Sequence, residues 1–428
     1  MTSEVAVMNR LAVALAADSA VSVSDGRRNK IYNTANKLFM LSNHDPVGIM
    51  VYSNGSLMGV PWEVLIKTFR QTIEKNAFVQ LEEYASAFIN YIEAQTSLFT
   101  VDRERRHFRK MVESEFAELA NEIQATLEEM EGKLTEGDDW EVIRSATVHK
   151  IIKERHEEWR ERERHGSITE GRGRQLRTEC SGEVAQLATK FFRTRAWTVA
   201  SEDTTMLNEL AEFYVDKNYI APSSFSGVVI AGFGTGNFFP VLKRYRVGNI
   251  YDGKLKLVEI DAVKISDEVP VHVGVYADSG MADLFLKGFS ISALSYFLYG
   301  AFERGHQIAA EALKVAGVDP TPEQCDMIEA KTDEILDELV DKIQTYRHRS
   351  GNSDFERALV HIPKDELASV AASLVNLNSF KKRMSMNIES VGGPVDLAVI
   401  SKGDGFIWID RKHYFDADKN PNFMRRNS

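Results

Sequence analysis

Thr2 follows directly behind the initiator methionine, so removal of Met1 would make its amine the free N-terminus of the chain. A terminal α-amine has a pKa of roughly 7.7–8.0 and is partly unprotonated near neutral pH. It can therefore act as the base for the neighbouring threonine hydroxyl, which becomes able to attack a carbonyl carbon. We expect Thr2 to be a candidate nucleophile that passes through an acyl-enzyme and is released by water.

Two later segments contain the charged residues Asp18 and Lys37. Residues 15–19 read Leu-Ala-Ala-Asp-Ser, and residues 37–39 read Lys-Leu-Phe. Together with Thr-x-x-Val-x-Val at residues 2–7, this pattern resembles the start of proteasome β-subunits and of the related bacterial HslV peptidases. The segment Ser-Val-Gly-Gly-Pro-Val-Asp at residues 390–396 is similar to their last sheet segment. The resemblance covers residues 2–70 and, more loosely, residues 225–300 and 380–410.

The resemblance implies the fold and the roles of three residues. The fold would be an α+β N-terminal-nucleophile hydrolase, a four-layer αββα sandwich of two antiparallel sheets. Thr2 would be the nucleophile, Asp18 the acidic partner and Lys37 the catalytic lysine. A buried ammonium near Thr2 would lower the proton affinity of its amine and hydroxyl, and Asp18 would keep the lysine charged and oriented. Lys30 is a rival for Lys37, but it lacks the following Leu-Phe.

The remaining site residues follow from the same resemblance. An oxyanion donor is needed for the tetrahedral intermediate, and its place falls in the turn from Ser53 to Gly55, where Ser53 replaces the usual glycine. Ser390 matches a serine that positions the terminal amine. Asn387 stands where the family has an aspartate, and Ser279 is a weaker match to another amine-positioning residue.

The order of patterns along the chain predicts three zones: residues 1–74 and 216–428 as two parts of the hydrolase-like domain, and residues 75–215 as a helical insertion. We expect a hairpin turning at residues 9–10, a strand at 47–52 and a helix at 62–69. The last zone predicts strands at 226–234, 254–260, 271–275, 395–400 and 406–409, with helices at 282–302, 305–315, 322–346 and 364–380. The apolar run at residues 288–302 suggests a buried helix rather than a membrane span.

Composition narrows the function classes. Among 428 residues, 43% are hydrophobic and 27% charged, and the net charge of −11 argues against broad nucleic-acid binding. The only two cysteines, Cys180 and Cys325, have no metal-site spacing, so we expect no disulfide framework, no metal and a reducing cytoplasm. A leader-like run at residues 10–20 is short and preceded by Glu4, which disfavours a signal peptide.

Several other motifs have ordinary explanations. Residues 232–237 match a dinucleotide loop only in part, because Asn237 stands at the third glycine position and no helix pattern follows. We therefore predict no cofactor. His149, His156 and His165 lie in a stretch of mixed charges and are expected to be solvated surface residues. Gly166, Gly171 and Gly173 are expected to mark a flexible break.

The sequence leaves three functions open. The first is a cytoplasmic, proteasome-like threonine peptidase or amidohydrolase acting on peptides or proteins, a homo-oligomer and possibly a ring, with an adaptor or unfoldase bound through the helical insert. The second is a catalytically inactive scaffold or binding protein of the same fold, whose helical insert recognises a partner. A third, binding of polyanions or membranes through residues 150–177, is disfavoured by the acidity of the chain; we expect no nucleic acid and no membrane.

Overall fold

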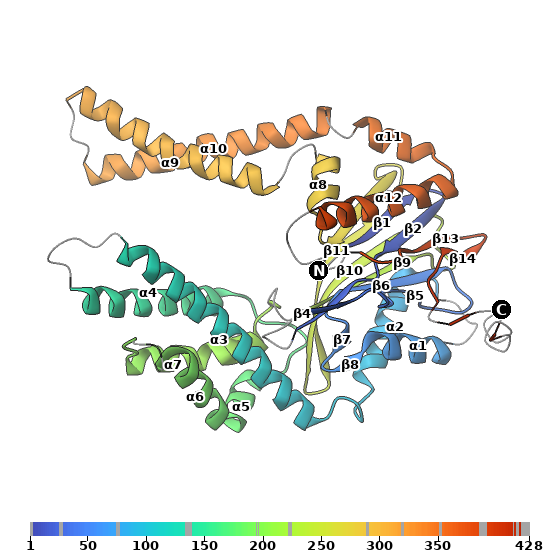
Figure 1. Ribbon diagram of the computed structural model, residues 1–428, viewed down its shortest axis with the longest axis horizontal. Coiled ribbons are helices and arrows are strands. Elements are labelled where there is room, and N and C mark those ends of the chain that lie inside the picture. Colours follow the sequence, from blue (N-terminus) through green and yellow to red (C-terminus); the bar gives the residue numbers. More distant parts are fainter. Residues whose placement is uncertain are drawn as a thin grey trace. The chain divides into compact units, whose positions relative to one another are not determined.

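The computed structural model is a mixed α+β protein with two antiparallel five-stranded sheets (Figure 1). It describes residues 3–24, 29–73, 78–132, 139–193, 195, 197–220, 225–287, 291–317, 321–350, 353–384, 392–413, 415–416 and 419–420. The chain divides into two compact units. The first unit comprises residues 1–38, 238–240 and 264–428, and the second comprises residues 39–237 and 241–263.

The first unit is built on a sheet of order β12-β1-β2-β13-β14. Its strands are β1 (Ser3–Asn9), β2 (Ala12–Ala17), β12 (Val271–Ala277), β13 (Asp396–Ser401) and β14 (Gly405–Asp410). The predicted hairpin at residues 9–10 and the predicted C-terminal strand pair are both present. β1 is central, because it pairs antiparallel with β2 on one side and β12 on the other. The unit also contains the small hairpin of β3 (Val21–Ser24) and β4 (Asn29–Tyr32).

One helix covers this sheet. α12 (Lys364–Arg383) lies across β1 and β2 (Figure 1), and its buried apolar residues form one cluster with Val5, Val7, Ala14 and Ala16. The opposite face of the sheet is also withdrawn from water, since Ala6, Met8, Val13 and Leu15 are fully buried. Both faces of the strands are therefore apolar, which explains their nearly continuous hydrophobic sequence.

The first unit carries four more helices: α8 (Gly280–Lys287), α9 (Ile291–Val315), α10 (Pro322–Ser350) and α11 (Ser353–His361). α9 and α10 pack against each other as a long antiparallel pair (Figure 1). The expectation of a buried helix at residues 288–302 was wrong. Residues 288–290 lie outside the described residues, and on α9 Tyr296 is 82% exposed and Phe297 64% exposed. Among the described elements, α10 is the helix that packs along α9, and it leaves these side chains in contact with solvent.

The second unit contains the other sheet, of order β11-β10-β9-β6-β5. Its strands are β5 (Leu38–Met40), β6 (Val47–Ser53), β9 (Ser226–Gly232), β10 (Val241–Tyr251) and β11 (Lys254–Lys264). Val47, Ile49 and Val51 face a core formed with α1 (Trp62–Thr72) and α2 (Leu81–Glu93). A two-stranded hairpin of β7 (Ser56–Leu57) and β8 (Val60–Pro61) precedes α1. β10 was not predicted from the sequence.

The rest of the second unit is a helical region with its own core. It contains α3 (Val101–Glu131), α4 (Trp140–Glu161), α5 (Arg172–Glu179), α6 (Ser181–Ala188), the π-helix η1 (Thr189–Arg193) and α7 (Ser201–Asp216). Phe108, Phe116, Trp159 and Leu210 belong to one buried cluster. The proposed borders at residues 74/75 and 215/216 remain predictions. Among the described helices, none has the length and apolar character needed to span a membrane.

Gly173 has a packing role instead of marking a flexible break. It lies in α5, and a Cβ added there would come 2.3 Å from the backbone oxygen of Glu212 in α7. The Gly173 amide donates to Asp216 Oδ1 at 2.9 Å. Only glycine lets the two helices approach this closely.

We predict that Gly173→Ala lowers the free energy of unfolding by about 2 kcal/mol or more, because the added methyl forces α5 away from α7. Gly182 in α6 is the matched control, since a Cβ there meets nothing within 4 Å. Gly182→Ala should raise stability by up to about 1 kcal/mol, as alanine is the better helix former. Urea denaturation of the three proteins measures both effects. Equal stability of Gly173→Ala and the wild type would contradict the close contact.

Candidate functional site

A buried ion pair joins Asp18 and Lys37 in the first unit. The Lys37 Nζ lies 2.6 Å from Asp18 Oδ1, with 7% of the lysine side chain and none of the aspartate side chain exposed. Asp18 directly follows β2 and Lys37 directly precedes β5. Burial lowers the pKa of Lys37, while the charge and hydrogen bond of Asp18 raise it again. Asp18 therefore favours the charged lysine, as expected, but the lowering of the Lys37 pKa by burial is the larger effect.

Asp18 also organises the backbone around it. Its Oδ1 accepts a hydrogen bond from the Ser3 amide at 3.0 Å, and its Oδ2 accepts one from the Gly392 amide at 2.9 Å. The Asp18 amide in turn donates to the Ser3 carbonyl at 3.1 Å. Asp18 therefore fixes the first described residue of β1 and the segment that leads into β13.

The Gly392-Gly393 segment needs its glycines. Gly393 has φ +77°, and a Cβ there would come 2.9 Å from Cβ of Asn33. The Gly392 carbonyl accepts a bond from the Ser19 amide at 3.1 Å, and Ser19 Oγ donates to the Pro394 carbonyl at 2.5 Å. The segment singled out in the sequence thus closes over Asp18 and Ser19.

Glu4 is a second buried acid beside this pair. It is fully buried, and neither of its carboxylate oxygens has a hydrogen-bond partner among the described residues. Burial raises the pKa of Glu4 well above its usual value, against the attraction of Lys37. The register places Tyr276, Glu4, Ala17 and Asp396 side by side across four strands. Glu4 lies on the sheet face opposite Val5, where burial disfavours its charged form.

Asn378 was missed by the sequence analysis. It is buried on α12, and its amide nitrogen donates to Ser3 Oγ at 2.8 Å and to the Asp278 carbonyl at 2.9 Å. Its Oδ1 accepts from the amides of Met281 and Ala282, at the start of α8. Asn378 thus ties the start of β1 to the turn after β12. A polar residue on the apolar face of a predicted helix was the available signal.

The other predicted site residues have different outcomes. Thr2, Asn387 and Ser390 lie outside the described residues, so their roles remain predictions. Ser279 is in the turn after β12, where its carbonyl accepts from the Asp283 amide at 2.6 Å. Lys30 lies in β4 with its Nζ over the Tyr32 ring, so Lys37 is the lysine that pairs with Asp18.

The predicted oxyanion turn, residues 53–55, lies in the second unit. Ser53 ends β6 with φ +69°, the left-handed backbone that a glycine adopts without strain. The Asn54 amide donates to the Phe225 carbonyl at 3.4 Å. Within the described part of the chain, the Gly55 N–H forms no hydrogen bond. Of these amides, that of Gly55 is the one available to an oxyanion.

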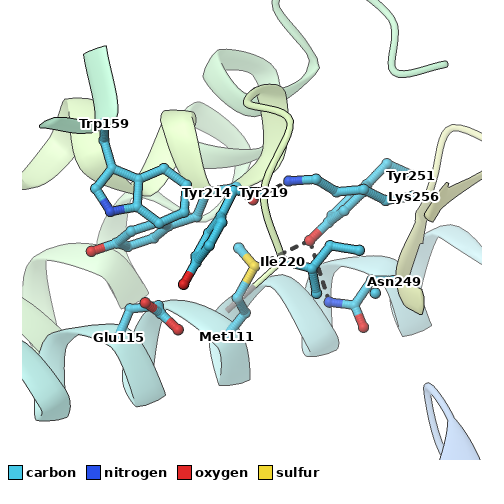
Figure 2. A pocket seen from close by; sticks show the side chains of 10 residues that line it. Met111, Glu115, Trp159, Tyr214, Tyr219, Ile220, Asn249, Tyr251 and Lys256 are labelled. Atoms are coloured by element: carbon cyan, nitrogen blue, oxygen red, sulfur yellow. Dashed lines mark hydrogen bonds between the residues drawn. The ribbon is translucent and has the colours of Figure 1, made fainter. Parts of the chain in front are cut away.

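A second group of buried titratable residues surrounds a small cavity in the second unit (Figure 2). Its volume is about 20 Å³, enough for one water molecule. Lys256 donates to the Tyr214 carbonyl at 2.8 Å, near the end of α7, and burial lowers the pKa of Lys256 to about 7. The Tyr214 hydroxyl has no hydrogen-bond partner among the described residues. Lys256 thus stabilises the C-terminus of a helix at the cost of desolvating its amine.

The three histidines of the charged stretch were wrongly expected to be solvated as a group. His156 and His165 are buried. His156 Nε2 lies 2.6 Å from Glu209 Oε2, and His165 Nε2 lies 2.7 Å from the Leu257 carbonyl. Only His149 is substantially exposed, and its Nδ1 lies 2.7 Å from Asp203 Oδ1. No three His, Cys, Asp or Glu residues of the described ranges are grouped as a metal site.

Comparison of the chain with known proteins does not identify a family for it. No protein-family model matches the chain, and no curated protein matches it. The solved structures similar to it include a Gly-1 mutant of Anbu from Hyphomicrobium sp. strain MC1. That similarity has a TM-score of 0.27 and 10% identity over 100% of this chain and 96% of that chain. A similarity this low does not establish a shared fold.

We predict that the Asp18–Lys37 pair is strongly coupled. Lys37→Met and Asp18→Asn should each lower the free energy of unfolding by about 3 kcal/mol, because each leaves a buried partner uncompensated. The double variant should lose at least about 1.5 kcal/mol less than the sum of the two. Denaturant unfolding of the four proteins measures this coupling, and Lys30→Met serves as an exposed control. Additive losses would contradict a direct pair.

We predict a pH-dependent penalty from Lys256. Burial lowers the pKa of Lys256 from its usual 10.5 to about 7 in the folded protein, so the unfolded chain binds more protons between these values and stability rises with pH across that window. The free energy of unfolding of Lys256→Met minus that of the wild type should therefore be larger at pH 6 than at pH 10, by on the order of 4 kcal/mol. Lys254→Met, on the same strand but exposed, is the control. The measurement is urea unfolding at both pH values; a constant difference between variant and wild type would rule out the buried charge.

Proposed function

We propose that the chain is an N-terminal-nucleophile hydrolase of the threonine type, with Thr2 as nucleophile and peptides or proteins as substrates. The observation that supports this most is the buried Asp18–Lys37 pair, whose aspartate also holds the Ser3 amide. Thr2 is bonded to that amide, so the proposal puts its hydroxyl and amine close to the lysine. A lysine and an aspartate at this distance, both withdrawn from water, form an electrostatic environment suited to activating a hydroxyl.

The proposed fold is the four-layer αββα sandwich. Each sheet supports it separately. In the first unit α12 covers one face while Ala6 and Leu15 are buried on the other, and in the second α1 and α2 cover one face while Met50 and Val229 are buried on the other. Sheets that are apolar on both faces need a second cover.

The proposed reaction uses few groups. The Thr2 oxygen bonds to the substrate carbonyl carbon as its proton passes to the α-amine. The amide C–N bond then breaks, and the leaving amine takes that proton. Water adds to the resulting ester and releases the acid, which restores the hydroxyl. The positive charge of Lys37 lowers the proton affinity of the terminal amine and hydroxyl. The Gly55 N–H is the proposed donor to the oxyanion.

Oligomerisation and any adaptor or unfoldase remain part of this proposal. A homo-oligomer, possibly a ring, would enclose such a site and restrict its substrates to extended chains. The helical region from α3 to α7 is the proposed surface for a partner.

We predict that Met1 is absent from the mature protein and that Thr2→Ala lowers hydrolysis of fluorogenic peptides by at least about 10³-fold, because no other hydroxyl has the terminal amine as its base. Intact mass spectrometry tests the first point, and peptide assays with a threonine-directed electrophile test the second. Thr2→Ser should keep measurable activity.

The matched lysine pair refines this test. Lys37→Met should lower the rate by about 10² or more, while Lys30→Met should leave it unchanged. A retained Met1 would leave Thr2 without its base and would favour the inactive scaffold or binding protein instead. Electrophile labelling that persists in Thr2→Ala would place the nucleophile elsewhere.

A further inference from the structure

The second unit contains a polar cavity beside the turn that carries Gly55, the proposed oxyanion donor. Its volume is about 270 Å³, and it lies between the hairpin of β7 and β8, one face of α3, and strands β9 and β10. The helix contributes His107, Lys110, Met111 and Ser114, whose spacing of three and four residues places them on one face. The other described lining residues are Asn54, Ser56, Leu57, Met58, Gly59, Ser226, Val247, Gly248 and Asn249.

The walls of this cavity are fixed by hydrogen bonds. Met58 and Gly59 both have positive φ, of +49° and +82°, in the two-residue turn between β7 and β8. The Met58 sulfur accepts a bond from the Ile250 amide, and its carbonyl accepts one from Arg103 Nη1 at 3.4 Å. Ser226 Oγ donates to the Asn54 carbonyl at 3.0 Å. Because the turn is held from both β10 and α3, the cavity does not depend on a mobile loop.

The charge of the lining is of one sign. Lys110 carries the full charge, His107 is titratable, and no carboxylate stands among the described lining residues. Arg103 and Arg106 on the same helix add to the positive field at His107. The chain as a whole has a net charge of −11, opposite in sign to this lining. The lining would attract an anion and repel a cation.

The polar groups of the lining are free to bind. Within the described ranges, the Lys110 ammonium and the Ser114 hydroxyl have no hydrogen-bond partner. Asn249 Nδ2 donates to the Tyr251 hydroxyl at 3.3 Å, which leaves its Oδ1 available. Leu57, Met111 and Val247 supply apolar surface beside these groups. An apolar wall with a few convergent polar groups is typical of small-molecule sites.

We propose that this cavity binds a small organic molecule bearing an oxyanion, either a carboxylate or a phosphate. Lys110 neutralises its charge, Ser114 donates to it, and the apolar side chains contact its carbon skeleton. Binding does not require the hydrolase to be active. The binding proposal can therefore be tested independently of the role of Thr2.

His107 gives the site a protonation signature. Burial, followed by Lys110, Arg103 and Arg106, lowers the pKa of His107, while the Met58 carbonyl raises it. No other charged group among the described lining residues faces the ring. A bound oxyanion offsets the three cations and raises the pKa of His107 again, so binding is coupled to proton uptake.

The experiment is isothermal titration calorimetry of the full-length protein with glutarate and with inorganic phosphate, at constant ionic strength. Glutaramide, which has the same skeleton without charge, is the ligand control. Lys110→Met should weaken binding at least about 10-fold, and Ser114→Ala should weaken it to a lesser extent. Lys153→Met, which removes an exposed lysine on α4, should change it less than about 2-fold. Thr2→Ala should bind as the wild type does.

The outcomes separate the two kinds of ligand. Saturable binding of glutarate alone identifies a carboxylate site, and saturable binding of phosphate alone identifies a phosphate site. In either case the affinity must fall in Lys110→Met. His107→Asn should abolish the proton uptake measured in buffers of different ionisation enthalpy. The proposal is overturned if neither anion binds, if glutaramide binds as well as glutarate, or if Ser114→Ala and a folded Lys110→Met both bind as the wild type does.

Discussion

The first unit depends on the full desolvation of one carboxylate, that of Asp18. Removing such a group from water costs several kcal/mol unless its oxygens are all satisfied. Asp18 meets this requirement with Lys37 and with the amides of Ser3 and Gly392, which come from three separate parts of the chain. The start of β1, the end of β2, the approach to β5 and the approach to β13 are therefore positioned by one acid.

The same burial sets the protonation states around it. Glu4 lies in the field of Asp18 and Lys37, its oxygens have no hydrogen-bond partner among the described residues, and burial raises its pKa well above the usual value. An ionised Glu4 would add a second negative charge next to Asp18. Burial lowers the pKa of Lys37, so its ammonium group gives up a proton more easily. This property is useful at a site that transfers protons.

The sequence predicted those features that depend on local pattern. The hairpin at residues 9–10, α1 and the last strand pair follow from periodicity and turn residues, and the pairing of Asp18 with Lys37 followed from family spacing. β10 was missed because Lys243 and Arg244 interrupt its apolar pattern. Both find partners within the sheet, Lys243 in Glu259 of the adjacent β11 and Arg244 in the Tyr52 hydroxyl of β6. Asn378 and Glu4 could not be placed, since their neighbours Ser3, Asp278 and Tyr276 lie close only after the chain has folded. Gly173 looked like a break because sequence alone does not show the carbonyl of Glu212 against it.

In the second unit, three of the described non-glycine residues have positive φ, and two of them, Ser53 and Met58, lie in one short segment; the third is Asp252. Ser53 and Met58 both hold positive φ, which costs a residue with a Cβ roughly 1–2 kcal/mol each. The surrounding structure imposes these conformations: the Trp62 indole donates to Ser226 Oγ, Ser226 binds the Asn54 carbonyl, and the Trp62 amide donates to the Gly55 carbonyl. With its carbonyls held in this way, the segment keeps the Gly55 N–H pointing in one direction before any ligand arrives. A donor fixed in advance needs no reorganisation when negative charge develops, and this is the property that an oxyanion site requires.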